Sequence, residues 1–121
     1  MISKWLDDMG VENYIINDDY TIDIINSGID LSCKNLYEFP DYIQFDRVDG
    51  YFYCNINHLS SLRGCPKYIG DEFDCSDNDL KQLKNCPEYV GYNFYCGGNP
   101  SEFTKEEVMN QCKVLSTCIY V

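Results

Sequence analysis

Apolar residues recur at a fixed interval along the central part of the chain. Phe52 and Cys54 return 21 positions later as Phe73 and Cys75, with variable residues between them. Each of these units also holds one asparagine, two leucines and a Cys-Pro pair at matching positions. We number positions from the first residue of each unit, and the three clear units begin at Asp49, Gly70 and Gly91. Alternation of apolar and variable residues is typical of a short β-strand, so positions 3 to 6 are predicted to be strand.

A longer copy of 23 residues precedes the clear units. It places Ile29 and Leu31 at positions 4 and 6, but it has Lys34 where the later units have asparagine. The third clear unit departs from the pattern at Pro100. Because one such unit cannot bury its apolar face alone, the units are expected to stack around a continuous core. The sequence therefore predicts a solenoid of about four coils over residues 28–103.

Two further features describe the path of each coil. Asn57, Asn78 and Asn99 fall where the chain must turn inward, and their side chains can bond backbone groups that would otherwise be buried without partners. The returning segment 63–69 contains Pro66 and has little helical periodicity, so it is predicted to be extended or turn-like.

Residues 1–27 lack the repeat and are predicted to cap the amino end of the stack. Ser3 can cap a short helix that runs through Met9 and ends at Gly10. Residues 13–16 and 21–25 flank a polar turn and are predicted to form a β-hairpin that pairs with or covers the first coil.

Residues 104–121 are predicted to close the carboxyl end. Thr104 and Glu107 have the spacing of a capping box for a helix to about Cys112, with Val108, Met109 and Cys112 on the face toward the last coil. A final short strand is expected within residues 116–121.

Each unit reads x-x-x-Phe-x-Cys-x-x-Asn-x-Leu-x-x-Leu, which resembles the leucine-rich repeat with Phe and Cys in place of two leucines. The position of the first leucine is taken by Asp49, Gly70 or Gly91. The short length and the later proline resemble repeats of bacterial effectors, and the Asn-x-Leu-x-x-Leu-x-x-Cys-Pro-x-Tyr-Val-Gly run is similar to small repeat proteins of phages and giant viruses. The resemblance covers residues 28–104. It implies an α/β solenoid, a β-rich right-handed superhelix with an amino-terminal helix and hairpin cap and a carboxyl-terminal helix cap.

The length and the net charge of the chain limit the kinds of function that are expected. A chain of 121 residues fits one domain, and its net charge of −11 argues against direct binding to nucleic acid or to an anionic membrane surface. There is no apolar run of membrane-spanning length and no signal-peptide core, so a cytoplasmic location is expected. The absence of alanine and the excess of Lys over Arg suggest A/T-rich coding, as in a phage or large virus, for which the location is the host cytoplasm.

Eight cysteines raise three alternatives: reduced core thiols, a disulfide framework or a metal site. Cys54, Cys75 and Cys96 share the alternating apolar column, and cysteine is a small side chain that suits a narrow interior. No Cys-x-x-Cys pair is present. We expect reduced thiols with no metal and no cofactor, and we expect Cys33 to be the exposed one.

Candidate catalytic groups are few. His58 is the only histidine and holds a variable position, so it is expected to face solvent. The Asp-rich runs do not follow a calcium-binding loop pattern, and no glycine-rich phosphate loop is present. No catalytic residue and no enzymatic activity are therefore predicted.

What remains is the strand surface, which in leucine-rich repeats is the concave side. Its positions 3 and 5 alternate tyrosine with acidic residues, and tyrosine is enriched in protein interfaces. We expect a protein partner with a basic patch, and the main function hypothesis is a non-enzymatic interaction module, such as a viral accessory factor acting on a host protein. A nucleic-acid mimic that inhibits a host defence protein is the alternative, cross-strand packing alone is a third interpretation, and the oligomeric state stays open. The predicted contact residues are Asp30, Tyr51, Tyr53, Glu72, Asp74, Asn93 and Tyr95.

Overall fold

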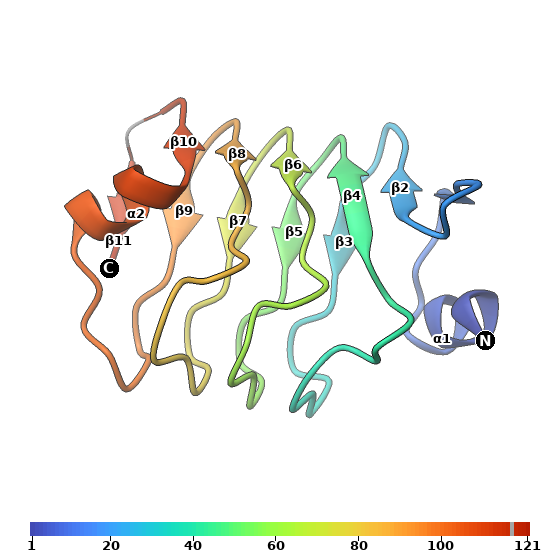
Figure 1. Ribbon diagram of the computed structural model, residues 1–121, viewed down its shortest axis with the longest axis horizontal. Helices are drawn as coiled ribbons and strands as arrows, with labels where there is room; N and C mark the ends of the chain where they lie inside the picture. The colour runs from blue at the N-terminus through green and yellow to red at the C-terminus, as the bar shows by residue number, and fades with distance from the viewer. Residues whose placement is uncertain (117) are drawn as a thin grey trace.

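The computed structural model describes residues 1–116 and 118–121 and shows a β-solenoid of about four turns (Figure 1). Each turn passes through two sheets that lie on opposite sides of the stack, and within each sheet the strands of successive turns are parallel. Sheet A has six strands: β1 (Tyr14–Ile16), β2 (Ile22–Ile24), β4 (Phe45–Val48), β6 (Tyr68–Ile69), β8 (Tyr89–Val90) and β10 (Lys113–Val114). Sheet B has five: β3 (Ile29–Asp30), β5 (Phe52–Tyr53), β7 (Phe73–Asp74), β9 (Phe94–Tyr95) and β11 (Ile119–Tyr120).

The strand register confirms the repeat. Phe52 pairs with Phe73, and Phe73 pairs with Phe94, so each turn of the solenoid takes 21 residues. Ile29 pairs with Phe52, which confirms that the first unit has 23 residues. Cys33 is therefore not part of the buried cysteine column, although it precedes Cys54 by 21 positions.

The core follows from the alternation within sheet B. The rings of Phe52, Phe73 and Phe94 are fully buried, with centroids 6.2 and 5.1 Å apart along the column. Cys54, Cys75 and Cys96 form the buried column beside them. Small thiols next to large rings fill the narrow space between the two sheets, because a close-packed interior must match the volume between its layers.

The asparagine ladder predicted for the turns is present. Asn78 Oδ1 accepts a hydrogen bond of 2.9 Å from the Leu59 backbone N–H, and its Nδ2 lies 3.0 Å from the Cys54 carbonyl and 3.1 Å from that of Cys75. Asn57 and Asn99 make the equivalent bonds one coil before and one coil after. Each asparagine thereby joins two coils and satisfies backbone groups that are shielded from water.

Glycine at position 1 explains why the first leucine of the repeat is absent. A Cβ atom on Gly70 would collide with the backbone oxygen of Asp49, and one on Gly91 would collide with that of Gly70. At Gly70 and Gly91 the coils approach each other too closely for a side chain, whereas Asp49 holds this position in the first clear unit.

The returning segments are extended, as predicted, and they also pair into a second sheet. Tyr68 pairs with Tyr89, and Ile69 pairs with Val90, on the side of the stack opposite sheet B. Within the described residues the coils contain no helix, and the two helices lie at opposite ends of the molecule (Figure 1). The α/β character implied by the resemblance is thus limited to the ends.

At the amino end, helix α1 spans Ile2–Asp8, so the prediction of Ser3 as its cap was wrong. Ser3 lies inside the helix, because the Met1 carbonyl already accepts a hydrogen bond from Trp5 N–H. The predicted hairpin is confirmed: β1 and β2 are antiparallel, and β2 pairs with β4 in sheet A.

At the other end, helix α2 spans Lys105–Gln111 and begins with the predicted Thr104–Glu107 capping box. Val108 and Cys112 are buried, but Met109 is 60% exposed, so its assignment to the inner face was wrong. The final strand is confirmed as β11, whereas β10 was not predicted. Among the described residues, no helix has both the length and the apolar character needed to cross a membrane.

Candidate functional site

The outward face of sheet B brings the predicted contact residues together. Asp30, Tyr53, Asp74 and Tyr95 are register partners on four successive strands, so acidic and aromatic side chains alternate along the sheet. Tyr120 on β11 pairs with Tyr95 and extends the row. We call the surface formed by these five residues, with Tyr51, Glu72 and Asn93, the tyrosine face.

Stacked rings make up much of the tyrosine face. Tyr51 and Tyr53 lie with centroids 4.4 Å apart and an interplanar angle of 23°. Tyr95 and Tyr120 stack at 4.8 Å and 12°. The ring of Tyr51 lies over Gly28, where an added Cβ would collide with it. The glycine therefore creates the space into which the first ring leans.

The carboxylate of Glu72 links the two pairs of rings. Its Oε1 accepts a 2.9 Å hydrogen bond from the Tyr53 hydroxyl, and its Oε2 accepts one of 3.2 Å from the Tyr95 hydroxyl. Asn93 Nδ2 donates to Glu72 Oε2 at 2.9 Å and to the Tyr95 hydroxyl oxygen at 3.0 Å. Three donors from two neighbouring strands thus hold one acidic side chain, and the network fixes the tilt of both rings.

The protonation properties of the tyrosine face follow from this arrangement. Burial, followed by the hydrogen bond to Glu72 and its negative charge, raises the pKa of Tyr53 to about 12. Burial also raises the pKa of the Asp74 carboxyl, against the opposing effect of hydrogen bonds from Ser76. The network therefore keeps the Tyr53 hydroxyl protonated as a donor.

Asp30 and Asp74 have the same local geometry. Asp30 Oδ1 accepts hydrogen bonds from the backbone N–H and hydroxyl of Ser32, at 2.9 and 2.6 Å. Asp74 Oδ1 accepts the same pair from Ser76, at 2.9 and 2.5 Å. In both residues Oδ2 accepts no hydrogen bond from the described part of the chain. Each turn therefore orients a carboxylate and leaves one of its oxygens available.

At two residues of the tyrosine face the structure differs from the prediction. Asn93 is only 9% exposed, so it supports Glu72 and Tyr95 from beneath and offers little contact area. Tyr120 is 52% exposed and was not predicted as a contact residue. The signal was the Ile-Tyr pair at 119–120, which has the apolar-tyrosine order of positions 4 and 5 in β5 and β9.

The outward face of sheet A carries a second ladder that the sequence did not predict. The Arg47 guanidinium lies 4.3 Å from the centroid of the Tyr68 ring, and Tyr68 stacks on Tyr89 at 4.7 Å and 1°. Lys113 pairs with Tyr89 on the next strand. The two sheets thus present tyrosine ladders with basic ends on one side and acidic residues on the other.

The thiols behave mostly as core residues. Cys54, Cys65, Cys75, Cys86, Cys96 and Cys112 are buried and unpaired by disulfides, whereas Cys33 and Cys118 are exposed. A hydrogen bond with Cys65, followed by burial, raises the pKa of the Cys54 thiol well above its ordinary value. In the described part of the chain, no group of three or more His, Cys, Asp or Glu side chains is arranged to hold a metal ion.

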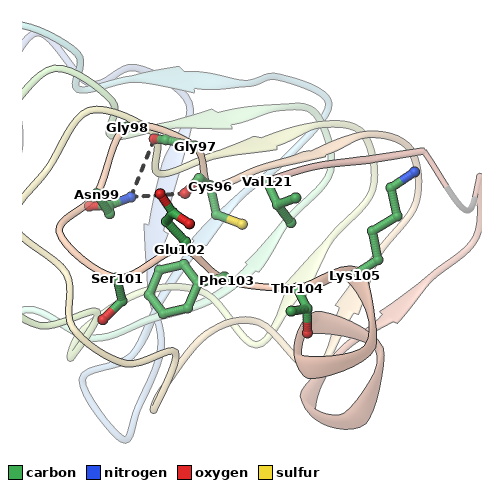
Figure 2. A pocket seen from close by; sticks show the side chains of 10 residues that line it. All are labelled: Cys96, Gly97, Gly98, Asn99, Ser101, Glu102, Phe103, Thr104, Lys105 and Val121. Carbon is green, nitrogen blue, oxygen red and sulfur yellow. Dashed lines mark hydrogen bonds between the residues drawn. The ribbon is translucent and has the colours of Figure 1, made fainter.

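A cavity of about 650 Å³ lies beside α2, between Cys96, Phe103 and Val121 (Figure 2). Burial raises the pKa of the Cys96 thiol to about 12, so the thiolate needed of a nucleophile is not formed near neutral pH. The Asn99 side chain in the cavity wall is bonded to the backbone carbonyls of Cys96 and Gly97. The cavity lining contains no histidine among the described residues.

His58 lies elsewhere and is exposed, as predicted. Its ring stacks on Tyr37 at 4.7 Å, and its Nδ1 is 4.0 Å from Asp79 Oδ2. None of these three residues lines the cavity of Figure 2. The arrangement around His58 is that of a surface contact between adjacent coils.

Comparison of the chain with protein-family models, with characterised proteins and with solved structures found no match in any of the three.

Proposed function

We propose that this protein is a non-enzymatic protein–protein interaction module and that the tyrosine face is its binding surface. The observation that carries the proposal is the hydrogen-bonded row of rings around Glu72. Side chains that are already held in place lose little conformational entropy on binding, and tyrosine contributes a large contact area with few rotatable bonds. The tyrosine face is therefore suited to bind a flat or extended segment of another protein.

The charge of this face defines the partner. In the four repeat units that form β3, β5, β7 and β9, positions 3 and 5 include three acidic residues, namely Asp30, Glu72 and Asp74, and no Lys or Arg. A basic patch on the partner complements such a surface, and it speeds encounter as well as favouring the correct orientation.

We also propose that the coils are related to leucine-rich repeats and that the two helices cap the ends of the stack. The asparagine ladder supports a relation of the coils to leucine-rich repeats. The buried side chains of Leu6 in α1 and Val108 in α2 support a capping role for both helices. A phage or viral accessory factor, acting on a protein of the host cytoplasm, is the biological setting that the repeat resemblance favours.

A nucleic-acid mimic is the second candidate function. It is favoured by the small number of ion pairs. The chain has twenty acidic residues and nine Lys and Arg residues, and only three of these basic side chains form salt bridges among the described residues. A mimic would occupy a cationic groove chiefly through charge, so its binding would fall steeply with salt. Binding through the tyrosine face would instead persist at moderate salt.

The test compares two double variants. Tyr53→Ala with Tyr95→Ala removes rings from the tyrosine face, and Tyr68→Ala with Tyr89→Ala removes the matched ladder from sheet A. Ligands are first selected from a random-peptide display library against the wild-type chain, and each is then titrated against both variants at two salt concentrations. The proposal expects the first variant to lose binding and the second to retain it, with unchanged circular dichroism. Equal binding to both variants would reject the tyrosine face.

A further inference from the structure

Two carboxylates on the tyrosine face repeat with a defined spacing. Asp30 and Asp74 are held by the same Asp-x-Ser turn and lie on β3 and β7, with only β5 between them. Strands in a sheet are 4.7 to 4.9 Å apart, so two steps across the sheet separate these residues by about 9.6 Å. The Oδ2 atoms of Asp30 and Asp74, which accept no hydrogen bond within the described part of the chain, thus present two acceptors separated by two strand spacings.

A polyproline II helix has the matching period. It rises about 3.1 Å per residue with three residues per turn, so every third side chain lies on the same face, about 9.3 Å apart. A segment in this conformation that crosses the strands of sheet B would place side chains three residues apart over Asp30 and Asp74. The three faces of such a helix point about 120° apart, so a segment turned with two faces toward the sheet also places one of the two intervening residues over β5, which presents Tyr53 and the stacked Tyr51 ring. Aromatic side chains are the usual contacts for proline rings in such segments.

Arginine is the basic residue that fits the acidic positions. Its guanidinium can donate to a carboxylate and pack against a tyrosine ring at the same time, whereas a lysine ammonium is a strongly hydrated point charge. The molecule itself contains this combination on sheet A: Arg47 lies 4.3 Å from the Tyr68 ring centroid, and its Nε is 3.0 Å from Asp49 Oδ1. Sheet B presents the acceptors and the rings but not the cation: positions 3 and 5 of the four units that form β3, β5, β7 and β9 contain no Lys or Arg.

We propose that the tyrosine face binds a proline-rich segment of a partner protein in the polyproline II conformation, with two arginines three residues apart. One arginine contacts Asp30, the other contacts Asp74 between the Tyr53 and Tyr95 strands, and one of the two intervening prolines lies on Tyr51 and Tyr53. Glu72 acts as a positioning residue, because it holds the rings through its hydrogen bonds. This inference rests on the proposed function and names the partner chemistry of that same face.

The experiment uses three fluorescein-labelled peptides and the full chain, with binding followed by fluorescence anisotropy. The first peptide is Pro-Pro-Arg-Pro-Pro-Arg-Pro-Pro, the second has both arginines replaced by lysine, and the third has the same composition with the arginines two residues apart, Pro-Pro-Pro-Arg-Pro-Arg-Pro-Pro. Each charge-assisted contact to a partly exposed carboxylate is expected to change affinity by about threefold to tenfold. The first peptide is therefore expected to bind about tenfold more tightly than either control.

Two protein variants locate the arginines. Asp74→Asn is expected to lower the affinity for the first peptide about tenfold. Asp30→Asn is expected to lower it only about threefold, because Asp30 is the more exposed of the two residues and its contact is more strongly screened by solvent. Asp79→Asn, at an exposed acidic position outside the tyrosine face, is the matched control and is expected to have no effect. Equal affinity for the first and third peptides, or equal effects of all three variants, would overturn the inference.

The outcomes separate this inference from the proposed function. Display-selected ligands that depend on Tyr53 and Tyr95 but lack the arginine spacing would overturn the inference and leave the binding face in place. Ligands that ignore both rings would overturn both proposals. Sedimentation of the chain alone tests a second copy as the occupant, and a dimer dispersed by the Tyr53→Ala and Tyr95→Ala variant would also overturn the inference.

Discussion

Sheets A and B are formed by the same coils and pack against the same interior, yet their outward faces differ in chemistry. On sheet B, Glu72 accepts hydrogen bonds from two tyrosines on the strands that flank β7, and the acidic residues Asp30 and Asp74 hold the matching outward positions of β3 and β7. On sheet A, Arg47 covers the end of a tyrosine stack and Lys113 pairs with Tyr89.

The difference shows how a solenoid separates structure from function. Inward positions must satisfy one shared packing geometry, so they repeat closely between coils. Outward positions contact only their neighbours on the same face, so each face can acquire its own charge and its own partner. The proposals above depend on this separation, and the following predictions test it from the largest expected effect to the smallest.

Phe73→Ala is expected to destabilise both sheets together. The ring is fully buried between its neighbours Phe52 and Phe94, so its loss is expected to lower the free energy of unfolding by about 3 to 5 kcal/mol. Urea unfolding is followed by far-ultraviolet circular dichroism and by the fluorescence of Trp5, the only tryptophan, which lies in α1.

The control for this experiment is Tyr92→Ala, since that side chain is 52% exposed and its loss should leave stability nearly unchanged. Coincident transitions by the two probes would show that both sheets unfold as one unit. If Trp5 unfolded separately from the rest of the chain, the shared interior would not couple the coils.

Asn78→Ala is expected to lower the free energy of unfolding by about 3 kcal/mol. The substitution leaves the buried Leu59 N–H without its side-chain partner. It also removes one of the two asparagine donors to each of the carbonyls of Cys54 and Cys75, which keep only Asn57 and Asn99 respectively. Chemical denaturation measures the loss, and Asn110→Ala on the exposed side of α2 is the matched control. A similar effect of the two substitutions would contradict a structural role for the ladder.

Substitutions at two equivalent positions in the bends after sheet B strands are expected to change the free energy of unfolding in opposite directions. Ile56 has a left-handed φ of 54°, an unfavourable conformation for a β-branched residue, so Ile56→Asn is expected to raise the free energy of unfolding by about 1 kcal/mol. Gly98 has a φ of 69° at the corresponding position, and a Cβ there would collide with the Asp77 side chain.

Gly98→Ala is therefore expected to lower the free energy of unfolding by about 1 to 2 kcal/mol. Thermal unfolding of the two variants under the same conditions checks both signs. A decrease for Ile56→Asn would mean that contacts of the isoleucine side chain outweigh the backbone strain.

Glu72→Gln is expected to affect sheet B alone and mainly through tyrosine ionisation. Burial keeps the pKa of Tyr53 raised, but loss of the negative charge should bring it down from about 12 toward its ordinary value of 10.0. Ultraviolet absorbance of the phenolate during alkaline titration measures the change. Tyr53→Phe identifies the signal, because it removes the titrating hydroxyl and leaves the other tyrosines in place.

The same shift predicts a pH dependence of stability. The raised pKa keeps Tyr53 neutral in the folded chain, so its contribution is fully present below pH 10 and is lost as the pH rises from about 10 through about 12. The loss of stability over this interval should be smaller in Glu72→Gln than in the wild type. An equal loss in both proteins would place the origin of the shift outside the Glu72 network.

The sequence predicted one sheet well because a single column of large apolar residues marks it. Phe52, Phe73 and Phe94 recur at one interval, and their partners in the structure are those that the interval implies. The strands β6 and β8 of sheet A were predicted only as extended chain, since they contribute two residues each and follow a proline, which gives no alternation to detect.

The candidate site shows the same division. The repeat frame placed Asp30, Tyr53, Asp74 and Tyr95 on one outward column, and the register confirms it. The frame could not indicate that Asn93 would be buried. It also ends before β11, so the Ile-Tyr order at 119–120 alone did not place Tyr120 in the row. Those outcomes depend on how β11 returns to β9 from beyond α2, which involves residues without a repeat.

The linear chain by itself determined the period, the inward columns and the positions of the turn asparagines, because these are local consequences of burying one apolar face per coil. Only the tertiary structure decided the contacts made across coils: the carboxylate of Glu72 between two tyrosine hydroxyls, the guanidinium of Arg47 over Tyr68, and the equivalent presentation of Asp30 and Asp74. Such contacts depend on the side-chain tilt and on the distance between strands. Neither quantity is encoded at a single position, since both arise when neighbouring coils pack together.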